Sequence, residues 1–182
     1  MLMHRPARTR SIRLSLDPFR PESPGDVETL VLPYEEAKVT VSRSIQEVFD
    51  FLADGVNAPR WMSWVIESTP VGYSGGAGAT YSQRTVSSLL GRKWIVYRIV
   101  HHHSPMTLGV EASSLPGRPT ARFRLTPMDV GITMLSVRAE FADGGGATAS
   151  MSAGQRWATH VVESLPQIKS ALESDHQREA AL

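Results

Sequence analysis

The spacing of apolar residues changes along the chain, and each change marks a different kind of element. After residue 34 the stretch EAKVTVS alternates between apolar and polar positions, which predicts a first strand. The next stretch, SIQEVFDFLADG, has apolar residues at helical spacing, and Ser44 and Glu47 occupy the two positions of a capping box. Gly55 predicts the end of this helix, and a second short helix is expected to end near Trp61.

The middle of the chain is strand-like throughout. A glycine-rich turn at 74–78 and a second turn at Leu90 and Gly91 separate alternating stretches. No connection is long enough for a parallel crossover, so the strands should form an antiparallel meander. The pattern predicts six strands, at residues 64–71, 79–89, 92–103, 106–113, 120–128 and 131–141.

The last periodic segment predicts a long C-terminal helix with a single apolar face. Pro166 lies inside this helix and should kink it. A curved antiparallel sheet beside one long amphipathic helix buries both apolar faces when the sheet wraps around the helix, and a cavity between them is expected. The apolar stripe consists of Trp157, Val161, Leu165, Ile168 and Leu172.

Composition sets the domain boundaries. Residues 1–33 form a basic, proline- and arginine-rich N-terminal extension, residues 34–176 a single α+β ligand-binding domain, and residues 177–182 a short tail. The extension has two interpretations that its sequence leaves open. It is either a basic arm for an anionic partner or organelle address, or an extension that is flexible or lies along the domain.

Charge and cysteine content exclude several function classes. The net charge of +1 gives no electrostatic case for nucleic acid binding. The absence of cysteine excludes disulfides and thiolate chemistry and fits a reducing compartment, so a cytoplasmic location is expected. No apolar run is long enough for a membrane span, and no secretory signal is evident at the N-terminus.

The order of elements resembles the helix-grip superfamily (SRPBCC), which includes START domains, plant Bet v 1-like proteins and bacterial polyketide cyclases/dehydrases. The stretches that support this are GAGATYSQ, GRKWIVYRIV, LTPMDVGITML and ESLPQIKSALES, together with the two-helix stretch SRSIQEVFDFLADGVNAPRWMSWV. The resemblance implies about seven strands wrapped around the C-terminal helix, two short helices after the first strand, and an apolar cavity under the long helix. Because this fold serves carriers, sensors and a few enzymes, it does not decide the function.

Arginine 98 is the first candidate for the cavity. Aromatase/cyclase relatives look similar around GRKW, and their inward arginine lies on the face of the tryptophan. By that resemblance Arg98 points inward with Trp94 and His102, and a guanidinium there would hold an enolate or carbonyl oxygen. The alternative is an ion pair of Arg98 with Glu111 or Glu140.

Aromatic residues and a second histidine complete the predicted ligand site. Flat rings suit a flat or apolar ligand, and Tyr81 would donate a hydrogen bond or a proton. The same rings are also typical of core packing. Where cyclising relatives have a tyrosine after the short helix, WMSWVIES has none, which weakens the aromatase assignment. Beyond Arg98 and His102, the predicted ligand contacts are Trp61, Trp64, Tyr81, Trp94, Trp157 and His160.

The triplet His101, His102 and His103 invites a metal-site interpretation. Neighbouring strand residues point to opposite faces, so the three rings cannot converge on one ion. No HExxH spacing occurs. We therefore expect a solvated strand end, with His102 as a contact at the cavity rim, and neither a metal nor a cofactor.

Three functions remain open from the sequence. The first is binding of a hydrophobic small molecule, polyketide-like or lipid-like. The second is a cofactor-independent polyketide cyclase, aromatase or dehydratase that uses Arg98, Tyr81 and an aromatic wall. The third is a protein-interaction module.

The assignment of Arg98 also has a consequence for the outer face of its strand. With Arg98 inward, Ile95, Tyr97 and Ile99 would face outward, covered by residues 11–20 of the extension or by a second copy in a homodimer.

Overall fold

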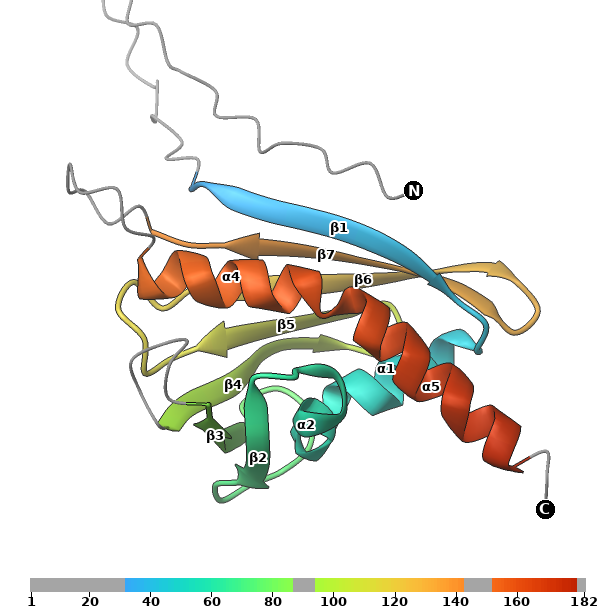
Figure 1. The fold of residues 1–182 in the computed structure, drawn as a ribbon, viewed down its shortest axis with the longest axis horizontal. Coiled ribbons are helices and arrows are strands. Elements are labelled where there is room, and N and C mark those ends of the chain that lie inside the picture. The colour runs from blue at the N-terminus through green and yellow to red at the C-terminus, as the bar shows by residue number, and fades with distance from the viewer. Residues whose placement is uncertain (1–31, 87–93, 143–151, 180–182) are drawn as a thin grey trace, which may run out of the picture.

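The computed structural model describes residues 32–86, 94–142 and 152–179. Within these ranges the chain forms one seven-stranded antiparallel sheet in the order β1-β7-β6-β5-β4-β3-β2. The sheet curves around two consecutive C-terminal helices, α4 and α5, and the short helices lie at the lower end of the same face (Figure 1). This is the arrangement that the resemblance to the helix-grip superfamily implied.

The element order agrees with the sequence prediction. The strands are β1 (Tyr34–Val41), β2 (Val65–Pro70), β3 (Thr80–Thr85), β4 (Trp94–His103), β5 (Thr107–Ala112), β6 (Thr120–Asp129) and β7 (Ile132–Glu140). The helices are α1 (Ile45–Ala53), the 3-10 turn η1 (Gly55–Asn57), α2 (Ala58–Trp61), α4 (Ala153–Glu163) and α5 (Leu165–Glu179). The predicted turn at Leu90 and Gly91, and residues 11–20 of the N-terminal extension, lie outside the described residues.

Helix α1 begins as predicted. The Ser44 side chain accepts a hydrogen bond from the Glu47 backbone, and the Glu47 carboxylate accepts one from the Ser44 backbone at 2.9 Å. This capping box satisfies amide groups that the first helical turn leaves without intrahelical partners. Val48, Phe49 and Leu52 are then buried against the sheet.

The predicted C-terminal helix is interrupted at Ser164 and forms two helices, α4 and α5, that lie at an angle to each other (Figure 1). Proline 166 has no N–H to donate to the carbonyl of Val162, so the regular ladder is interrupted there. The Ser164 hydroxyl donates instead to the His160 carbonyl at 2.6 Å, which closes the end of α4. The predicted stripe is confirmed on both helices, since all five of its side chains are buried: Trp157, Val161, Leu165, Ile168 and Leu172.

The bend lets the two helices contact different parts of the domain. Helix α4 packs on β1, β6 and β7, whereas α5 contacts β1 and α2 (Figure 1). Polar contacts secure α5 to the end of β1: Lys169 Nζ donates to the Thr40 carbonyl at 2.9 Å, and the Ser42 backbone donates to Glu173 at 2.9 Å. Strand β2, at the far edge of the sheet, packs against η1 and α2.

Candidate functional site

The inward face of β3 forms the floor of the candidate site. Tyr81, Gln83 and Thr85 alternate with partly exposed residues and are all buried. Gln83 is 0% exposed, which is unusual for a glutamine. Because every second residue of a strand faces the same side, Gln83 is the next inward-facing residue after Tyr81.

A β-bulge places a second polar side chain next to Gln83. In β2 the register shifts between Val65 and Glu67, so two consecutive residues face outward and both Val65 and Ser68 face inward. Ser68 is the direct cross-strand partner of Gln83. Side chains at such positions have their Cβ atoms about 5 Å apart. The two polar groups therefore share one patch of the inner face.

Neither of these side chains has its hydrogen bonds satisfied within the described part of the chain. Ser68 Oγ and both amide atoms of Gln83, Oε1 and Nε2, are buried without a partner. A buried polar group left in this state costs about 1–3 kcal/mol, and most native buried groups are paired. Three such atoms on one cross-strand pair indicate a place where a hydrogen-bonding ligand would be stabilised.

Two indole N–H groups are also buried without a partner among the described residues, Nε1 of Trp64 and Nε1 of Trp157. The Nε atoms of Arg98 and Arg156 are in the same state. Trp64 precedes β2, and its ring lies 6.1 Å from the ring of His160 on α4. Trp157 is one helical turn before His160. We call Trp64, Ser68, Gln83 and Trp157 the inner polar cluster.

A pocket opens on the same face of the sheet, at the end nearest α1. Its volume is about 350 Å³, within the usual range for small-molecule sites. We call it the rim pocket. Tyr81 lines this pocket, and Gln83 occupies the next inward position along β3. The rim pocket is lined by Asp50, Ala53, Asp54, Ser74, Gly75, Gly76, Tyr81 and His102.

Tyr81 is held by an unusually close packing contact. A Cβ atom on Gly55 would lie 2.5 Å from Cδ2 of Tyr81, so only glycine fits against this ring. The ring also makes an edge contact with Tyr97, at 6.1 Å between centroids. Burial raises the pKa of the Tyr81 hydroxyl above its ordinary value, although a backbone hydrogen bond with Gly55 opposes this. Tyr81 is therefore protonated at neutral pH.

His160 lies between the cluster and charged groups on α4 and β1. Burial lowers the pKa of His160, and the carboxylate of Glu163, 3.7 Å away, opposes that effect. Arg156 lowers the pKa further, whereas Glu35 raises it. The net shift is downward, so the imidazole is neutral at pH 7 and can both donate and accept a hydrogen bond.

The predicted inward orientation of Arg98 and Trp94 is wrong. Ile95, Tyr97 and Ile99 face the core and are almost fully buried, so the alternate residues of β4 face outward. Trp94 is 50% exposed. Arg98 Nη2 pairs with Glu111 at 3.4 Å, and Glu111 also pairs with Arg118 at 2.6 Å. The alternative prediction, an ion pair of Arg98 with Glu111, is therefore correct. The sequence left the choice open because both faces of β4 are apolar enough to be buried.

His102 does face inward, for a reason that periodicity did not give. The register of β4 shifts between Ile99 and His101, and this bulge inserts Val100 as an extra residue. The extra residue shifts the alternation of side chains by one position, so His102 faces the same inner side of the sheet as Ile99. Its ring makes an edge contact with Phe49, at 5.0 Å between centroids, and it lines the rim pocket. His101 and His103 are exposed, as expected for a solvated strand end.

The remaining aromatic candidates are divided between core and site. Trp61 is buried and makes an edge contact with Phe123 at 6.0 Å, which is a packing role. Trp64 and Trp157 have unpaired polar atoms and belong to the inner polar cluster. Within the described ranges, no group of three or more histidine or acidic side chains could hold a metal ion.

Sequence reasoning missed Ser68 and Gln83. Gln83 is in phase with Ala79 and Tyr81, so its position on the buried face could have been read from ATYSQRT. Ser68 could not, because the bulge in β2 alters the phase of that strand. The described helices include none that is long and apolar enough to cross a membrane.

This geometry defines a helix-grip protein with a partly polar interior. Comparison of the sequence with protein families matches residues 36–173 to the family described as polyketide cyclase/dehydrase and lipid transport, and the chain belongs to that family. No curated protein matches the chain at a significant level.

Solved structures support the fold at low sequence identity. Ara h 8.0201 is 17% identical, with 78% of this chain and 97% of that chain covered at a TM-score of 0.60. The Zhui aromatase/cyclase from Streptomyces sp. R1128 is 14% identical, with coverage of 82% and 96% and a TM-score of 0.59. A START superfamily protein from Mycobacterium smegmatis is 12% identical, with coverage of 80% and 97% and a TM-score of 0.57.

Proposed function

We propose that this protein binds a hydrophobic small molecule between the inner face of β2 to β4 and the C-terminal helices. The observation that carries the proposal is the inner polar cluster, in which buried hydrogen-bonding atoms face an otherwise apolar and aromatic interior. Small-molecule sites combine apolar walls with a few placed polar groups in this way. The rim pocket beside Tyr81 and His102 is the proposed point of entry.

Membership in the family favours this function but does not name the ligand. The Zhui protein is an aromatase/cyclase, and the family description also includes lipid transport. Both activities require a hydrophobic molecule to enter the domain. Binding is therefore the function common to the family, and it is the more direct conclusion.

Tryptophan fluorescence offers a direct test. Trp94 is exposed, whereas the other three tryptophans are buried, so the Trp94→Phe variant reports mainly on the interior. Titration of this variant with 2-methylnaphthalene should quench its emission with a saturable curve. A linear, non-saturating response, together with native mass spectra that contain no co-purified molecule, would contradict the proposal.

A second candidate function is cyclisation or dehydration of a polycarbonyl molecule. It is favoured by the rim pocket, which brings Tyr81, a protonated phenol, together with His102. Tyr81 would donate a hydrogen bond or proton to a carbonyl oxygen, and His102 would accept a proton from carbon. Arg98, which the sequence predicted to hold an enolate or carbonyl oxygen, has no part in this step because its side chain faces outward.

Mass spectrometry of the released molecule separates the two candidates. A carrier returns a bound polycarbonyl compound unchanged. A cyclase that condenses a ketone and then dehydrates it returns a product lighter by one water. In the second case Tyr81→Phe should keep binding and lose turnover, because phenylalanine preserves the ring and removes only the hydroxyl.

A further inference from the structure

The donors and acceptors of the inner polar cluster limit which polar group of a ligand would fit there. Gln83 offers one acceptor, Oε1, and one donor group, Nε2, side by side on a planar amide. Both are buried and unpaired within the described residues. A partner that satisfies both at once must present a donor and an acceptor at the same spacing. A second amide-like group does so through two parallel N–H···O bonds.

The surrounding groups favour additional oxygen acceptors. The two indole N–H groups of Trp64 and Trp157 can only donate. The Ser68 hydroxyl, across the strand from Gln83, can donate as well. Donors therefore outnumber acceptors in the inner polar cluster, and an oxygen with two lone pairs would be stabilised by more than one of them.

Charge decides between a neutral and an anionic group. The four side chains of the inner polar cluster are all uncharged, and an ion buried among them without a counter-charge would be strongly destabilised. His160, beside Trp64, is uncharged at neutral pH. The cation identified near it is Arg156 on α4, which is partly exposed although its Nε is buried without a partner, and the carboxylates of Glu163 and Glu35 act on the same histidine and offset that positive charge. The cluster therefore suits a neutral group better than a carboxylate.

We propose that Gln83 is the specificity-determining residue of the site, and that it selects flat, apolar molecules that end in a neutral group with an oxygen acceptor beside a hydrogen donor. A carboxamide and a neutral hydroxy-carbonyl are examples of this class. The inference rests on the proposed function, because it assumes that a ligand occupies the interior. It adds which ligands are preferred and which side chain makes the choice.

Three probes with one ring system test the inference. 2-Naphthamide carries the neutral acceptor and donor, 2-naphthoate carries an anion, and 2-methylnaphthalene carries neither. The wild-type protein should bind 2-naphthamide about tenfold more tightly than 2-methylnaphthalene, since a site with unpaired buried groups rejects a ligand that cannot satisfy them. It should bind 2-naphthamide more tightly than 2-naphthoate as well. Isothermal titration calorimetry gives each dissociation constant.

The decisive variant is Gln83→Met, which keeps the side-chain length and removes both polar atoms. It should lose the preference for 2-naphthamide and keep its affinity for 2-methylnaphthalene. Its melting temperature should rise, because an unpaired amide is replaced by an apolar group. Gln167→Met is the matched control: Gln167 is exposed on α5 and belongs neither to the rim pocket nor to the inner polar cluster, so its loss should change neither binding nor selectivity. Gln83→Leu provides a second replacement if the methionine variant does not fold.

The outcomes separate the two proposals. If 2-methylnaphthalene binds and 2-naphthamide binds no better, the role of Gln83 is overturned while the binding function stands. A preference for 2-naphthoate overturns the neutral class. If Gln83→Met melts lower and retains the wild-type selectivity, the amide has a structural role. If none of the three probes binds, the binding function itself fails for flat aromatic molecules, and the inference fails with it.

Discussion

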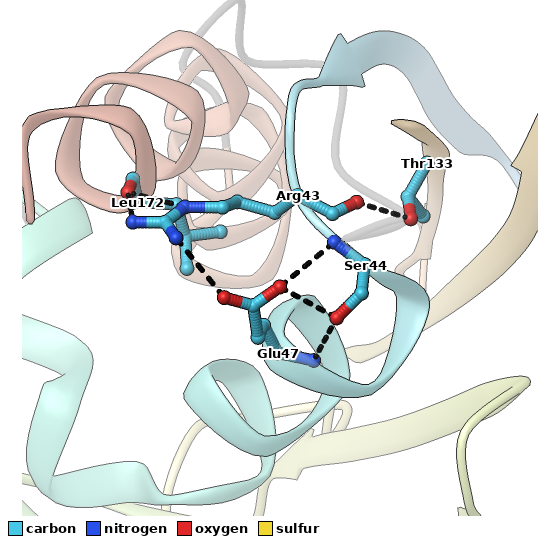
Figure 2. Close-up of polar contacts among 5 residues, drawn as sticks. All are labelled: Arg43, Ser44, Glu47, Thr133 and Leu172. Atoms are coloured by element: carbon cyan, nitrogen blue, oxygen red, sulfur yellow. Dashed lines mark hydrogen bonds and ion pairs between the residues drawn. The ribbon is translucent and has the colours of Figure 1, made fainter. Parts of the chain in front are cut away.

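The guanidinium of Arg43 donates two hydrogen bonds to the backbone carbonyl of Leu172, from Nε at 3.0 Å and from Nη2 at 2.8 Å. Its third nitrogen, Nη1, pairs with Glu47 at 3.0 Å, and the Arg43 carbonyl accepts a bond from Thr133 at 2.8 Å (Figure 2). Arg43 is 7% exposed. Arg43 thus joins α5 and the cap of α1 through its side chain and β7 through its backbone carbonyl, and it holds α5 close to the end of β1.

Replacement of Arg43 should destabilise the domain. Arg43→Leu removes the bonds to Leu172 and leaves the Glu47 carboxylate without this partner, and hydrogen bonds to charged groups contribute about 1.5–3 kcal/mol. We expect a loss of about 2–3 kcal/mol in the free energy of unfolding, measured by urea denaturation. Arg43→Lys should recover only part of this, because a single ammonium cannot replace the planar fork.

The control for Arg43 is another arginine in an exposed ion pair. Arg84 pairs with Glu67 at 3.1 Å near the edge of the sheet, and both side chains are largely exposed. Exposed pairs contribute about 0–1 kcal/mol, so Arg84→Leu should have a small effect. Equal losses for the two variants would show that Arg43 does not hold α5 in place.

Leu165 tests the apolar face of the C-terminal helices. It is buried at the start of α5, directly after the break at Ser164. Leu165→Ala should cost about 2–5 kcal/mol, as for other buried leucines. Val130, in the β6–β7 turn, is 97% exposed, so Val130→Ala should leave the melting temperature nearly unchanged. A negligible shift for Leu165→Ala would mean that the helix does not pack against the sheet through this residue.

The contact of Gly55 with Tyr81 should appear as energetic coupling. Gly55→Ala forces a methyl group into the Tyr81 ring and should destabilise the protein, whereas it should cost much less in a Tyr81→Ala background. A double-mutant cycle measured by urea denaturation gives the coupling. Gly154→Ala is the control, because its added Cβ would lie 3.6 Å from the nearest atom, an ordinary contact distance. Additive effects at Gly55 and Tyr81 would contradict the packing arrangement.

Stability should fall at acidic pH through His160. Because burial lowers the pKa of His160 in the folded state, the unfolded chain binds more protons just below the ordinary pKa of 6.5. The contribution of the neutral imidazole is fully present above that value and is lost as the pH falls toward the lowered pKa. His160→Gln should flatten this part of the curve, measured as melting temperature against pH. The carboxylates of Glu163 and Glu35 and the cation of Arg156 remain in the variant, so the difference isolates the imidazole.

Arg98 should have no effect on ligand binding. Its side chain lies on the outer face, where it pairs with Glu111. Arg98→Ala should therefore bind 2-methylnaphthalene and 2-naphthamide with wild-type dissociation constants in calorimetry. Glu111 keeps its shorter bond to Arg118 in this variant, so its carboxylate stays paired and the stability change should also be small. A marked loss of affinity in this variant alone would place Arg98 in the binding site. It would also mean that the opposite face of β4 points inward.

Local sequence patterns determined much of the fold. The capping box of Ser44 and Glu47, the stripe from Trp157 to Leu172 and the break near Pro166 depend on residues a few positions apart. Their physical causes, namely unpaired amides at a helix start, side-chain spacing on a helix and a missing N–H, act within one element. Such features can be predicted before any tertiary contact is known.

The composition of the site was decided only by tertiary structure. Both faces of β4 are apolar: one begins with Trp94 and the other with Ile95. Alternation therefore does not say which face is buried. The choice depends on pairing with β3 and β5, where Tyr97 lies opposite Tyr81 and Ala112. The bulges at Val100 and between Val65 and Glu67 then bring His102 and Ser68 to the inner face. A shift of one residue reverses every later side chain in a strand, and bulges arise from the pairing of distant strands, which the sequence of one strand does not contain.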